Sequence, residues 1–239
     1  TDPDFVDYIT SFDFCFLSET FTLPSFDFSI YFREFIVLHS PGVKLSRMGH
    51  VSGGCVLLIR KCLSDYVHII DTKYENIICA KLSRELFGSD KDVMFIGLYN
   101  HPANSVFYNS KDYDCTLELL EQFILSLMEG GDDDVHYLIG GDFNARLGDW
   151  CLNGGVNVFD VDDDDDDEVT SYTRKTQDDV TNAFGKILIQ FCSMFQLLPL
   201  NGLMKKGFDG NFTYFSERGN STIDFFLSSF DFVSHVKSL

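Results

Sequence analysis

The sequence predicts an α/β (α+β) layered sandwich. Two observations predict this class: short runs rich in β-branched and aromatic residues recur between turn residues, and helical periodicity separates some of them. The chain has 239 residues, of which 45% are hydrophobic and 25 are Phe, enough apolar material for a packed core. No internal repeat or Pro/Ser-rich linker divides it, so we expect a single domain over residues 1–239.

The expected strands are short apolar runs bounded by turn residues. In chain order they cover residues 13–17, 34–39, 54–60, 75–82, 92–99 and 135–140, followed by 211–215 and 221–227. Strands mixed with a small number of helices are typical of layered folds in which helices cover the faces of β-sheets.

Two segments have the periodicity of amphipathic helices. Residues 115–128 place Leu117, Leu120, Ile124 and Leu127 on one face, and the following Gly130 and Gly131 end the helix. Residues 182–195 repeat the pattern, with apolar side chains at Phe184, Ile187, Leu188, Phe191 and Phe195. Each helix therefore has one face that can cover a sheet.

The formal net charge of −19 is concentrated in one part of the chain. Residues 131–179 contain fifteen acidic and three basic residues, a local net charge of −12. So dense a run of like charge, centred on Asp162 to Glu168, predicts a solvated acidic loop at about 152–170. It lacks the spaced ligands and turn glycine of an EF-hand, so we do not expect a calcium site. Because the charge is local, it does not exclude a nucleic-acid partner.

Cysteine usage and hydropathy limit the remaining classes. The seven cysteines are scattered and never occur in CxxC spacing, which predicts free thiols in a reducing compartment and neither a zinc site nor a catalytic thiol. No run approaches 18 consecutive apolar residues, so we expect no membrane partner.

Four polar groups lie at or near the ends of expected strands. They are Glu19 after the first strand, Tyr99 at the end of 92–99, Asp142 with Asn144 after 135–140, and Asp224 within 221–227. Active sites of sheet proteins are commonly built in this way, because strands hold functional groups rigidly at their ends.

Each of these residues also has a purely structural interpretation. Glu19 could be a solvated charge, and Tyr99 a core ring with a bonded hydroxyl. Asp142 and Asn144 would point to the same side of an extended backbone, but could equally form a turn. Asp224 lies in an apolar segment and should therefore have a partner. The six histidines fall in no ligand-spaced pair, and we expect them to be structural or exposed.

In this order, the segments resemble the endonuclease/exonuclease/phosphatase superfamily. LSET at 17–20 resembles its metal-carboxylate motif, and GLYNHP at 97–102 its Tyr-bearing strand. GGDFNARLG at 140–148 resembles its Asp-x-Asn motif, and STIDFFLSS at 221–229 its late Ile-Asp-aromatic strand. The resemblance spans essentially the whole chain and implies a four-layered sandwich of two mixed, mostly antiparallel sheets packed face to face and flanked by helices.

Three further features resemble the branch encoded by non-LTR retrotransposons. They are SGGCVLLIR at 52–60, Arg174 with Asp178, and NAFGKILIQFCSMFQLLPLNG at 182–202. This likeness implies a DNA endonuclease that cuts target DNA before reverse transcription. It also implies a reverse transcriptase domain in the full-length protein, a monomeric nuclease domain and access to the nucleus.

The resemblance assigns a role to each site residue. Glu19 would hold Mg²⁺, with Mn²⁺ as an alternative ion. Asp142 would orient or deprotonate the attacking water, and Asn144 would hold the phosphate or the water in line. Tyr99 would donate a hydrogen bond to a phosphate oxygen, and Asp224 would orient the catalytic histidine.

The sequence also departs from the family pattern. The family's first strand, which carries an Asn, has no counterpart before Leu17, and no Ser-Asp-His motif follows Asp224; His235 is too close to that strand to serve. We therefore expect a chain clipped at both ends and weak or absent cleavage. Two other functions remain open: a phosphatase or phosphodiesterase for inositol phosphates or another small phosphoester, and a non-catalytic remnant.

Overall fold

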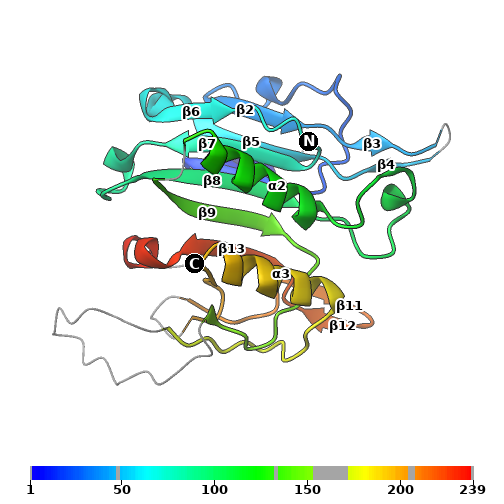
Figure 1. Cartoon of the computed structure of the whole chain (residues 1–239). Coiled ribbons are helices and arrows are strands. Elements are labelled where there is room, and N and C mark those ends of the chain that lie inside the picture. Colours follow the sequence, from blue (N-terminus) through cyan, green and yellow to red (C-terminus); the bar gives the residue numbers. More distant parts are fainter. Residues whose placement is uncertain (1, 47–48, 132–133, 153–171, 204–207, 238–239) are drawn as a thin grey trace. The chain divides into compact units, whose positions relative to one another are not determined.

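The computed structural model describes residues 2–46, 49–131, 134–152, 172–203 and 208–237. The chain divides into two compact units, residues 1–143 and 144–239 (Figure 1). Each unit is described by itself below. The predicted acidic loop at 152–170 lies outside the described residues from position 153 onward.

The first unit contains a three-stranded antiparallel sheet with β5 in its centre. Its order is β1-β5-β2, and Leu17 at the end of β1 pairs with Val56. The strands are β1 (Phe14–Leu17), β2 (Phe35–Ser40) and β5 (Cys55–Arg60). Because β5 is covered on both faces, its sequence is a continuous apolar run rather than an alternating one.

A second sheet of the first unit has the order β9-β8-β7-β6. Its strands are β6 (Val67–Ile70), β7 (Ile77–Leu82), β8 (Asp92–Tyr99) and β9 (Val135–Asp142). The pairs β6·β7 and β7·β8 are antiparallel, whereas β8 and β9 are parallel. Helix α2 (Thr116–Glu129) makes the crossover that a parallel pair requires.

The two sheets pack face to face, and helices cover their outer faces. A Cβ at Gly97 in β8 would collide with the ring of Phe16 in β1, so the Phe16 ring packs directly on the backbone of the facing sheet. Helix α2 buries the predicted apolar face against the second sheet (Figure 1). On the other side, helix α1 (Pro3–Ile9) and a 3-10 helix at Phe28–Ile30 pack on β5 through Ile9 and Phe28.

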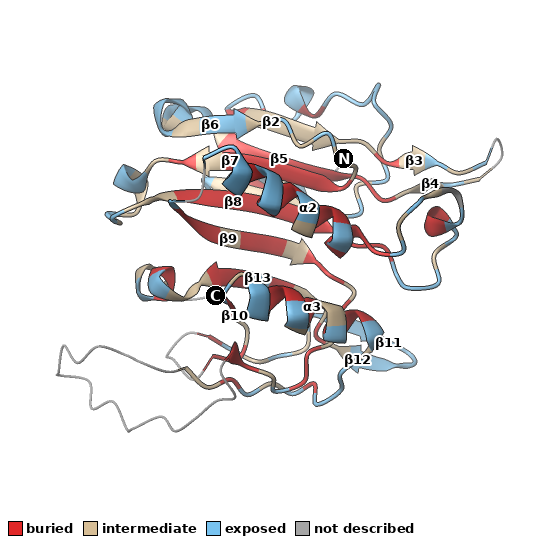
Figure 2. Cartoon of the chain, viewed as in Figure 1, coloured by how far each residue is buried: buried red, intermediate tan, exposed pale blue. Residues whose placement is uncertain are grey.

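The first unit therefore has the expected four layers, and its core lies between the sheets. Strands β5, β8 and β9 are almost wholly buried (Figure 2). A short hairpin of β3 (Val43–Lys44) and β4 (Val51–Ser52) completes this unit.

In the second unit, helix α3 packs beside a short antiparallel pair, β10 and β13. The elements are α3 (Ala183–Met194), β10 (Leu197–Pro199), β11 (Tyr214–Ser216), β12 (Gly219–Ser221) and β13 (Asp224–Ser229). The Asn182 side chain caps α3 by accepting a hydrogen bond from the Gly185 amide. Leu188 and Phe191 face the core as predicted, while Ile187 is only half-buried.

The predicted strands before residue 143 and both long helices are confirmed, with ends shifted by up to two residues. After residue 200 the prediction is less accurate. The strand expected at 211–215 begins only at Tyr214, as β11, and pairs with β12 in a hairpin. The strand expected at 221–227 begins at Asp224, as β13. All seven cysteines are free thiols. None of the helices in the described ranges is long and apolar enough for a membrane crossing.

Candidate functional site

Glu19 and Tyr99 meet at the ends of two different sheets. Glu19 lies in the loop after β1, and Tyr99 is the last residue of β8. The Tyr99 hydroxyl donates a hydrogen bond of 2.7 Å to Oε1 of Glu19. Two residues predicted from separate motifs, 80 positions apart in the chain, are thus in direct contact.

The loop that carries Glu19 is fixed by backbone hydrogen bonds to a pair of glycines. The Thr20 amide donates to the Gly54 carbonyl and the Phe21 amide to the Gly53 carbonyl, each at 3.0 Å. A Cβ at Gly54 would lie 2.7 Å from the Thr20 hydroxyl oxygen, and its φ of +89° also favours glycine. The close approach of this loop therefore requires a residue without a side chain there.

Asp142 is the register partner of Tyr99. The two residues end the neighbouring parallel strands β9 and β8, so both lie at the same edge of the sheet. Asp142 is only 8% exposed. The preceding Gly141 has a φ of +144°, and a Cβ there would collide with the carbonyl oxygen of Leu98. The backbones of β8 and β9 therefore approach so closely at Gly141 that only a residue without a side chain fits there.

These surroundings keep the Tyr99 hydroxyl protonated. Burial raises the pKa of Tyr99 far above its usual value, and the hydrogen bond to Glu19 raises it further. The negative charges of Glu19 and Asp142 act in the same direction. Tyr99 is therefore a hydrogen-bond donor throughout the physiological pH range.

Asn100 is a buried residue that fixes the end of β9, and the sequence analysis did not identify it. Its amide donates to the Asp142 carbonyl and its Nδ2 to the Phe143 carbonyl, both at 2.8 Å. Its Oδ1 accepts hydrogen bonds of 2.9 Å from the Tyr108 hydroxyl and the Thr116 amide. The only sequence signal was its place in the GLYNHP motif, directly after Tyr99.

A cavity of about 700 Å³ opens beside the Glu19–Tyr99 pair. Both residues line it, together with Phe21, His50, Ser52, His101, Pro102 and Val106. Phe21 is 52% exposed at its rim. No Lys or Arg occurs among its lining residues within the described ranges.

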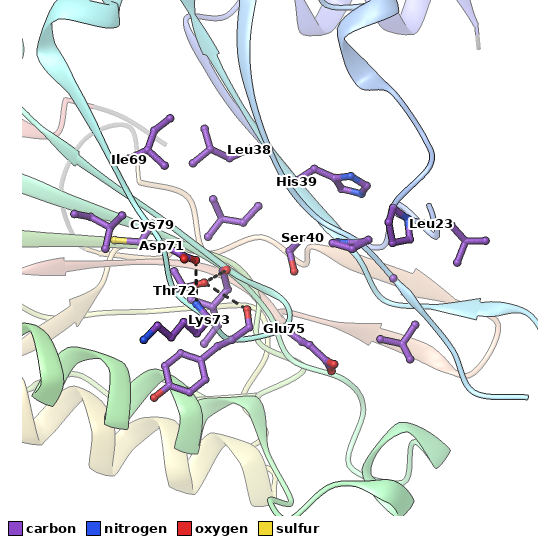
Figure 3. Close-up of a pocket in the computed structure, with 18 of the residues that line it drawn as sticks. Leu23, Leu38, His39, Ser40, Ile69, Asp71, Thr72, Lys73, Glu75 and Cys79 are labelled. Carbon is purple, nitrogen blue, oxygen red and sulfur yellow. Dashed lines mark hydrogen bonds between the residues drawn. The ribbon is translucent and has the colours of Figure 1, made fainter.

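A separate cavity of about 750 Å³ lies between β2 and the loop joining β6 to β7 (Figure 3). Leu38, His39, Ile69 and Cys79 line it, and Thr72 stabilises the loop by donating a 2.9 Å hydrogen bond to the Ile77 carbonyl. None of the predicted site residues lines this cavity.

In the second unit, Asn144 does not continue an extended strand. Its φ of +47° turns the backbone, so of the two alternatives left open by the sequence the structure has the turn. The turn is held by Asn182, whose Nδ2 donates to the Asn144 carbonyl at 3.1 Å and whose Oδ1 accepts from the Arg146 amide at 3.0 Å. The N-cap of α3 therefore fixes this loop.

Arg146 and Asp178 form the main ion pair of the second unit. The two guanidinium bonds are 2.8 Å from Nε and 2.5 Å from Nη2. Asp178 is buried and also accepts from the amides of Val180 and Thr222. Although burial raises the pKa of Asp178, these hydrogen bonds hold it below its usual value.

Arg174 is a buried cation whose hydrogen bonds go to backbone carbonyls. It is 5% exposed and donates to the carbonyls of Gly148, Trp150 and Asn201. Burial lowers the pKa of Arg174 to about 10. Arg174 and Asp178 therefore have structural roles in the loop that follows Asn144.

Asp224 is the first residue of β13 and is half-buried, so it does not lie inside the strand as expected. Its amide donates to the Thr213 hydroxyl at 3.1 Å, and its carbonyl accepts from Nδ2 of Asn201 at 3.1 Å. These contacts fix its backbone at the strand entrance.

His101 and His235 pack against aromatic rings, whereas His50 and His68 are exposed. His101 is 1% exposed, and its ring stacks on Phe107 at 3.7 Å and contacts the edge of Tyr99 at 4.7 Å. Burial lowers the pKa of His101 to about 4, so it is neutral at physiological pH. His235 ends a 3-10 helix after β13 and stacks on Phe232.

Solved structures of nucleic-acid enzymes share this fold. The 3′ phosphatase NExo from Neisseria, bound to a product DNA hairpin, aligns with a TM-score of 0.60 at 14% identity, over 97% of this chain and 82% of that one. The endonuclease domain of TRAS1, a telomere-specific non-LTR retrotransposon, gives 0.50 at 14% identity, over 97% and 79%. The AP endonuclease LMAP from Leishmania major gives 0.58 at 11% identity, over 97% and 73%.

At this level of identity the structural matches establish the fold alone. No curated protein shows a significant match to the sequence. The model of the Endonuclease/Exonuclease/phosphatase family, in contrast, matches residues 2–235, nearly the whole chain. The chain therefore belongs to the endonuclease/exonuclease/phosphatase family, whose members are hydrolases that include nucleases and phosphatases.

Proposed function

We propose that this chain is a Mg²⁺-dependent phosphodiester hydrolase of the retroelement endonuclease type, which nicks DNA. The contact between the Tyr99 hydroxyl and Glu19, next to the register partner Asp142, carries the proposal. It brings a protonated donor and two carboxylates to one edge of the fold. Such a set suits chemistry on a phosphoester, where negative charge develops on oxygen.

The donor set fits Mg²⁺. Magnesium is usually held by one or two carboxylates, and water and substrate oxygens complete its shell. Glu19 and Asp142 both act electrostatically on Tyr99. No group of three or more His, Cys, Asp or Glu residues that could form a closed metal cage occurs in the described part of the chain. Glu19 would hold the cation, with Mn²⁺ as a substitute.

When bound, the cation supplies positive charge that offsets the charge developing on the phosphoester oxygens. Asp142 would orient the attacking water or accept its proton. The buried Asn100 fixes the backbone that carries Asp142, because its amide donates a hydrogen bond to the Asp142 carbonyl. The Tyr99 hydroxyl donates a hydrogen bond to a phosphate oxygen, which replaces its hydrogen bond to Glu19. Its raised pKa keeps that proton in place.

Asn144 and Asp224 belong to the second unit, and their roles stay predictions. Asn144 is expected to hold the phosphate or the water, and its turn is fixed by Asn182. Asp224 is expected to orient a catalytic histidine. Substitution of each residue by Ala, assayed separately, tests these roles.

Plasmid nicking tests the proposal. Supercoiled plasmid is incubated with the chain and Mg²⁺, Mn²⁺ or EDTA, and rates are compared with those of Glu19→Gln and Asp142→Asn. The matched controls are Asp114→Asn and Glu118→Gln, both exposed carboxylates of the same unit. We expect slow metal-dependent nicking, as the departures from the family pattern predict, and a fall of about 100-fold or more in the two site variants but none in the controls.

Nicking that persists in EDTA, or in Asp142→Asn, would contradict the proposed mechanism. Direct Mn²⁺ binding, followed by electron paramagnetic resonance, provides a second readout that does not require cleavage. If the wild-type chain neither nicks DNA nor binds Mn²⁺, the proposed function is wrong.

Hydrolysis of a small phosphoester is the second candidate, and the charge distribution favours it. The formal net charge is −19, with 37 acidic residues against 18 basic ones. A DNA backbone would normally be met by such cations. Release of phosphate from a soluble inositol phosphate, measured beside plasmid nicking, separates the two candidates.

The retroelement assignment also proposes a reverse transcriptase domain in the full-length protein and a monomeric nuclease domain. The first of these rests on the sequence resemblance to the branch encoded by non-LTR retrotransposons. Sedimentation equilibrium of the purified chain tests the monomeric state, because a dimer would give twice the molar mass of one chain.

A further inference from the structure

We infer that Asn76, which precedes β7, is a positioning residue that holds Glu19 against Tyr99. The inference rests on the proposed function, because it assigns Asn76 to the same active site. Asn76 is 2% exposed and lies 57 residues from Glu19 and 23 from Tyr99 in the chain. It bonds the backbone of Tyr99 directly and is linked through Gly54 to Thr20, the residue after Glu19.

The backbone of Asn76 fixes the end of β8. Its carbonyl accepts a 2.9 Å hydrogen bond from the amide of Tyr99. Its own amide donates to the hydroxyl of Ser40, at the end of β2, at 2.9 Å. Asn76 therefore connects the last residue of β8 in one sheet to the last residue of β2 in the other.

The side chain of Asn76 fixes the glycine pair that carries the Glu19 loop. Its Oδ1 accepts a 3.0 Å hydrogen bond from the amide of Gly54. The Gly54 carbonyl in turn accepts from the amide of Thr20, the residue after Glu19. Two hydrogen bonds thus separate the Asn76 side chain from the backbone next to the candidate metal carboxylate.

The side-chain nitrogen of Asn76 contacts His101, and this contact fixes the orientation of the Asn76 amide and of the His101 ring. Because Oδ1 is occupied by Gly54, Nδ2 must be the donor to Nε2 of His101, at 3.3 Å. Nδ1 of His101 then carries the proton and faces the Ser52 hydroxyl at 3.4 Å. The His101 ring contacts the Tyr99 ring, so this network supports Tyr99 from a second side.

The backbone conformation supports a dedicated role. Asn76 has a φ of +61°, in the left-handed region that few residues other than Gly adopt. Asn tolerates this conformation better than most residues, and here four polar groups are satisfied at once. Gly would adopt the same backbone but would leave the Gly54 amide and His101 without this partner. The side chain, and not the turn alone, therefore accounts for Asn at this position.

Three variants separate positioning from folding. Asn76→Gly keeps the left-handed backbone and both backbone hydrogen bonds but removes both side-chain bonds. Asn76→Asp keeps the acceptor for Gly54 and removes the donor to His101. Lys73→Gly is the matched control, because Lys73 is exposed in the same loop and also has a positive φ, of +54°.

The first readout is hydrogen exchange of the Thr20 and Phe21 amides, with Leu57 in β5 as an internal reference. In Asn76→Gly we expect these two amides to exchange about tenfold faster or more, which corresponds to the loss of about one hydrogen bond. Leu57 should be unchanged. Asn76→Asp should retain most of the protection, and Lys73→Gly all of it.

The second readout is the Mg²⁺ concentration required for half-maximal nicking, with kcat and KM measured separately. Asn76→Gly should raise this concentration about fivefold and lower kcat about tenfold with little change in KM, because the carboxylate and not substrate binding is displaced. A merely structural role would leave the metal requirement unchanged in the folded fraction.

Wild-type amide exchange at Thr20 and Phe21 in Asn76→Gly would overturn the inference, as would an unchanged Mg²⁺ requirement. If Asn76→Gly does not fold, Asn76→Asp decides, since it must keep Thr20 protected. The exchange measurement needs neither metal nor cleavage. A wild-type chain that neither nicks DNA nor binds Mn²⁺ would therefore refute the proposed function, while the positions of Glu19 and Tyr99 would still be tested.

Discussion

Replacing Asn100 by Ala should destabilise the first unit strongly. Asn100 is completely buried, and its side chain bonds the Phe143 carbonyl, the Thr116 amide and the Tyr108 hydroxyl. The Tyr108 hydroxyl has another acceptor in the His101 carbonyl. The Phe143 carbonyl and the Thr116 amide, at the start of α2, would each lose their hydrogen bond to this side chain. The cost in the free energy of unfolding is about 1–3 kcal/mol for each group. We therefore expect a loss of about 4 kcal/mol.

A loss of this size lowers the midpoint of thermal unfolding by about 10 °C in a chain of this length. Urea and thermal unfolding, followed by far-UV circular dichroism, measure it. Asn104→Ala is the matched control, because Asn104 is exposed in the turn that follows β8. A loss below about 1 kcal/mol, or one equal to that of the control, would refute the role assigned to Asn100.

Three further predictions concern stability. Burial lowers the pKa of His101 to about 4, so between about pH 6.5 and pH 4 only the unfolded state binds a proton at this residue. The free energy of unfolding should therefore be highest above pH 6.5 and decline by up to about 3 kcal/mol towards pH 4. Urea unfolding at a series of pH values measures it. Asp178→Asn should cost about 3 kcal/mol at pH 7, because it breaks a buried pair with Arg146. The pKa of Asp178 is lowered in the folded state, so its stabilising charge is lost as the pH falls. The difference in unfolding free energy between wild type and Asp178→Asn should therefore shrink below about pH 4. Gly141→Ala should cost about 3 kcal/mol or more in the same assay, because its Cβ would collide with the Leu98 carbonyl.

Each of these predictions has its own control. His101→Gln should remove its share of the pH dependence, and an unchanged slope would contradict the prediction. A constant cost of Asp178→Asn from pH 7 to pH 3 would show that its charge does not matter. Gly88→Ala isolates the cost of a positive φ, because no atom lies near its Cβ; we expect about 1 kcal/mol there. An equal loss at Gly141 would show that the collision with Leu98 is relieved.

Strands buried on both faces were predictable, and exposed or very short strands were not. The continuous apolar runs of β5, β8 and β9 predict strands because burial there depends on local composition. Strand β6, which lies at a sheet edge with Ile69 half exposed, was not predicted. Strand β10 was also missed, because its three residues follow a helix without a turn signal.

The same division holds at the candidate site. Glu19, Tyr99 and Asp142 are identifiable from the sequence because each is a polar residue at the end of an apolar strand. The backbone turn at Asn144, with its φ of +47°, was only one of two alternatives, since Asn is compatible with a turn and with continued strand. Its cause lies 38 residues away, in the hydrogen bond from Asn182.

The amino-acid sequence by itself determined the sandwich class, the two long helices and three strand-end residues, because apolar periodicity and strand-end polarity are local properties. Only the tertiary structure revealed that Tyr99 contacts Glu19, and that Asn76 and Asn100 are buried at the centre of the hydrogen-bond networks around them. The physical reason is that a buried Asn satisfies backbone groups far away in the chain. Its partners are defined by packing and not by its sequence neighbours.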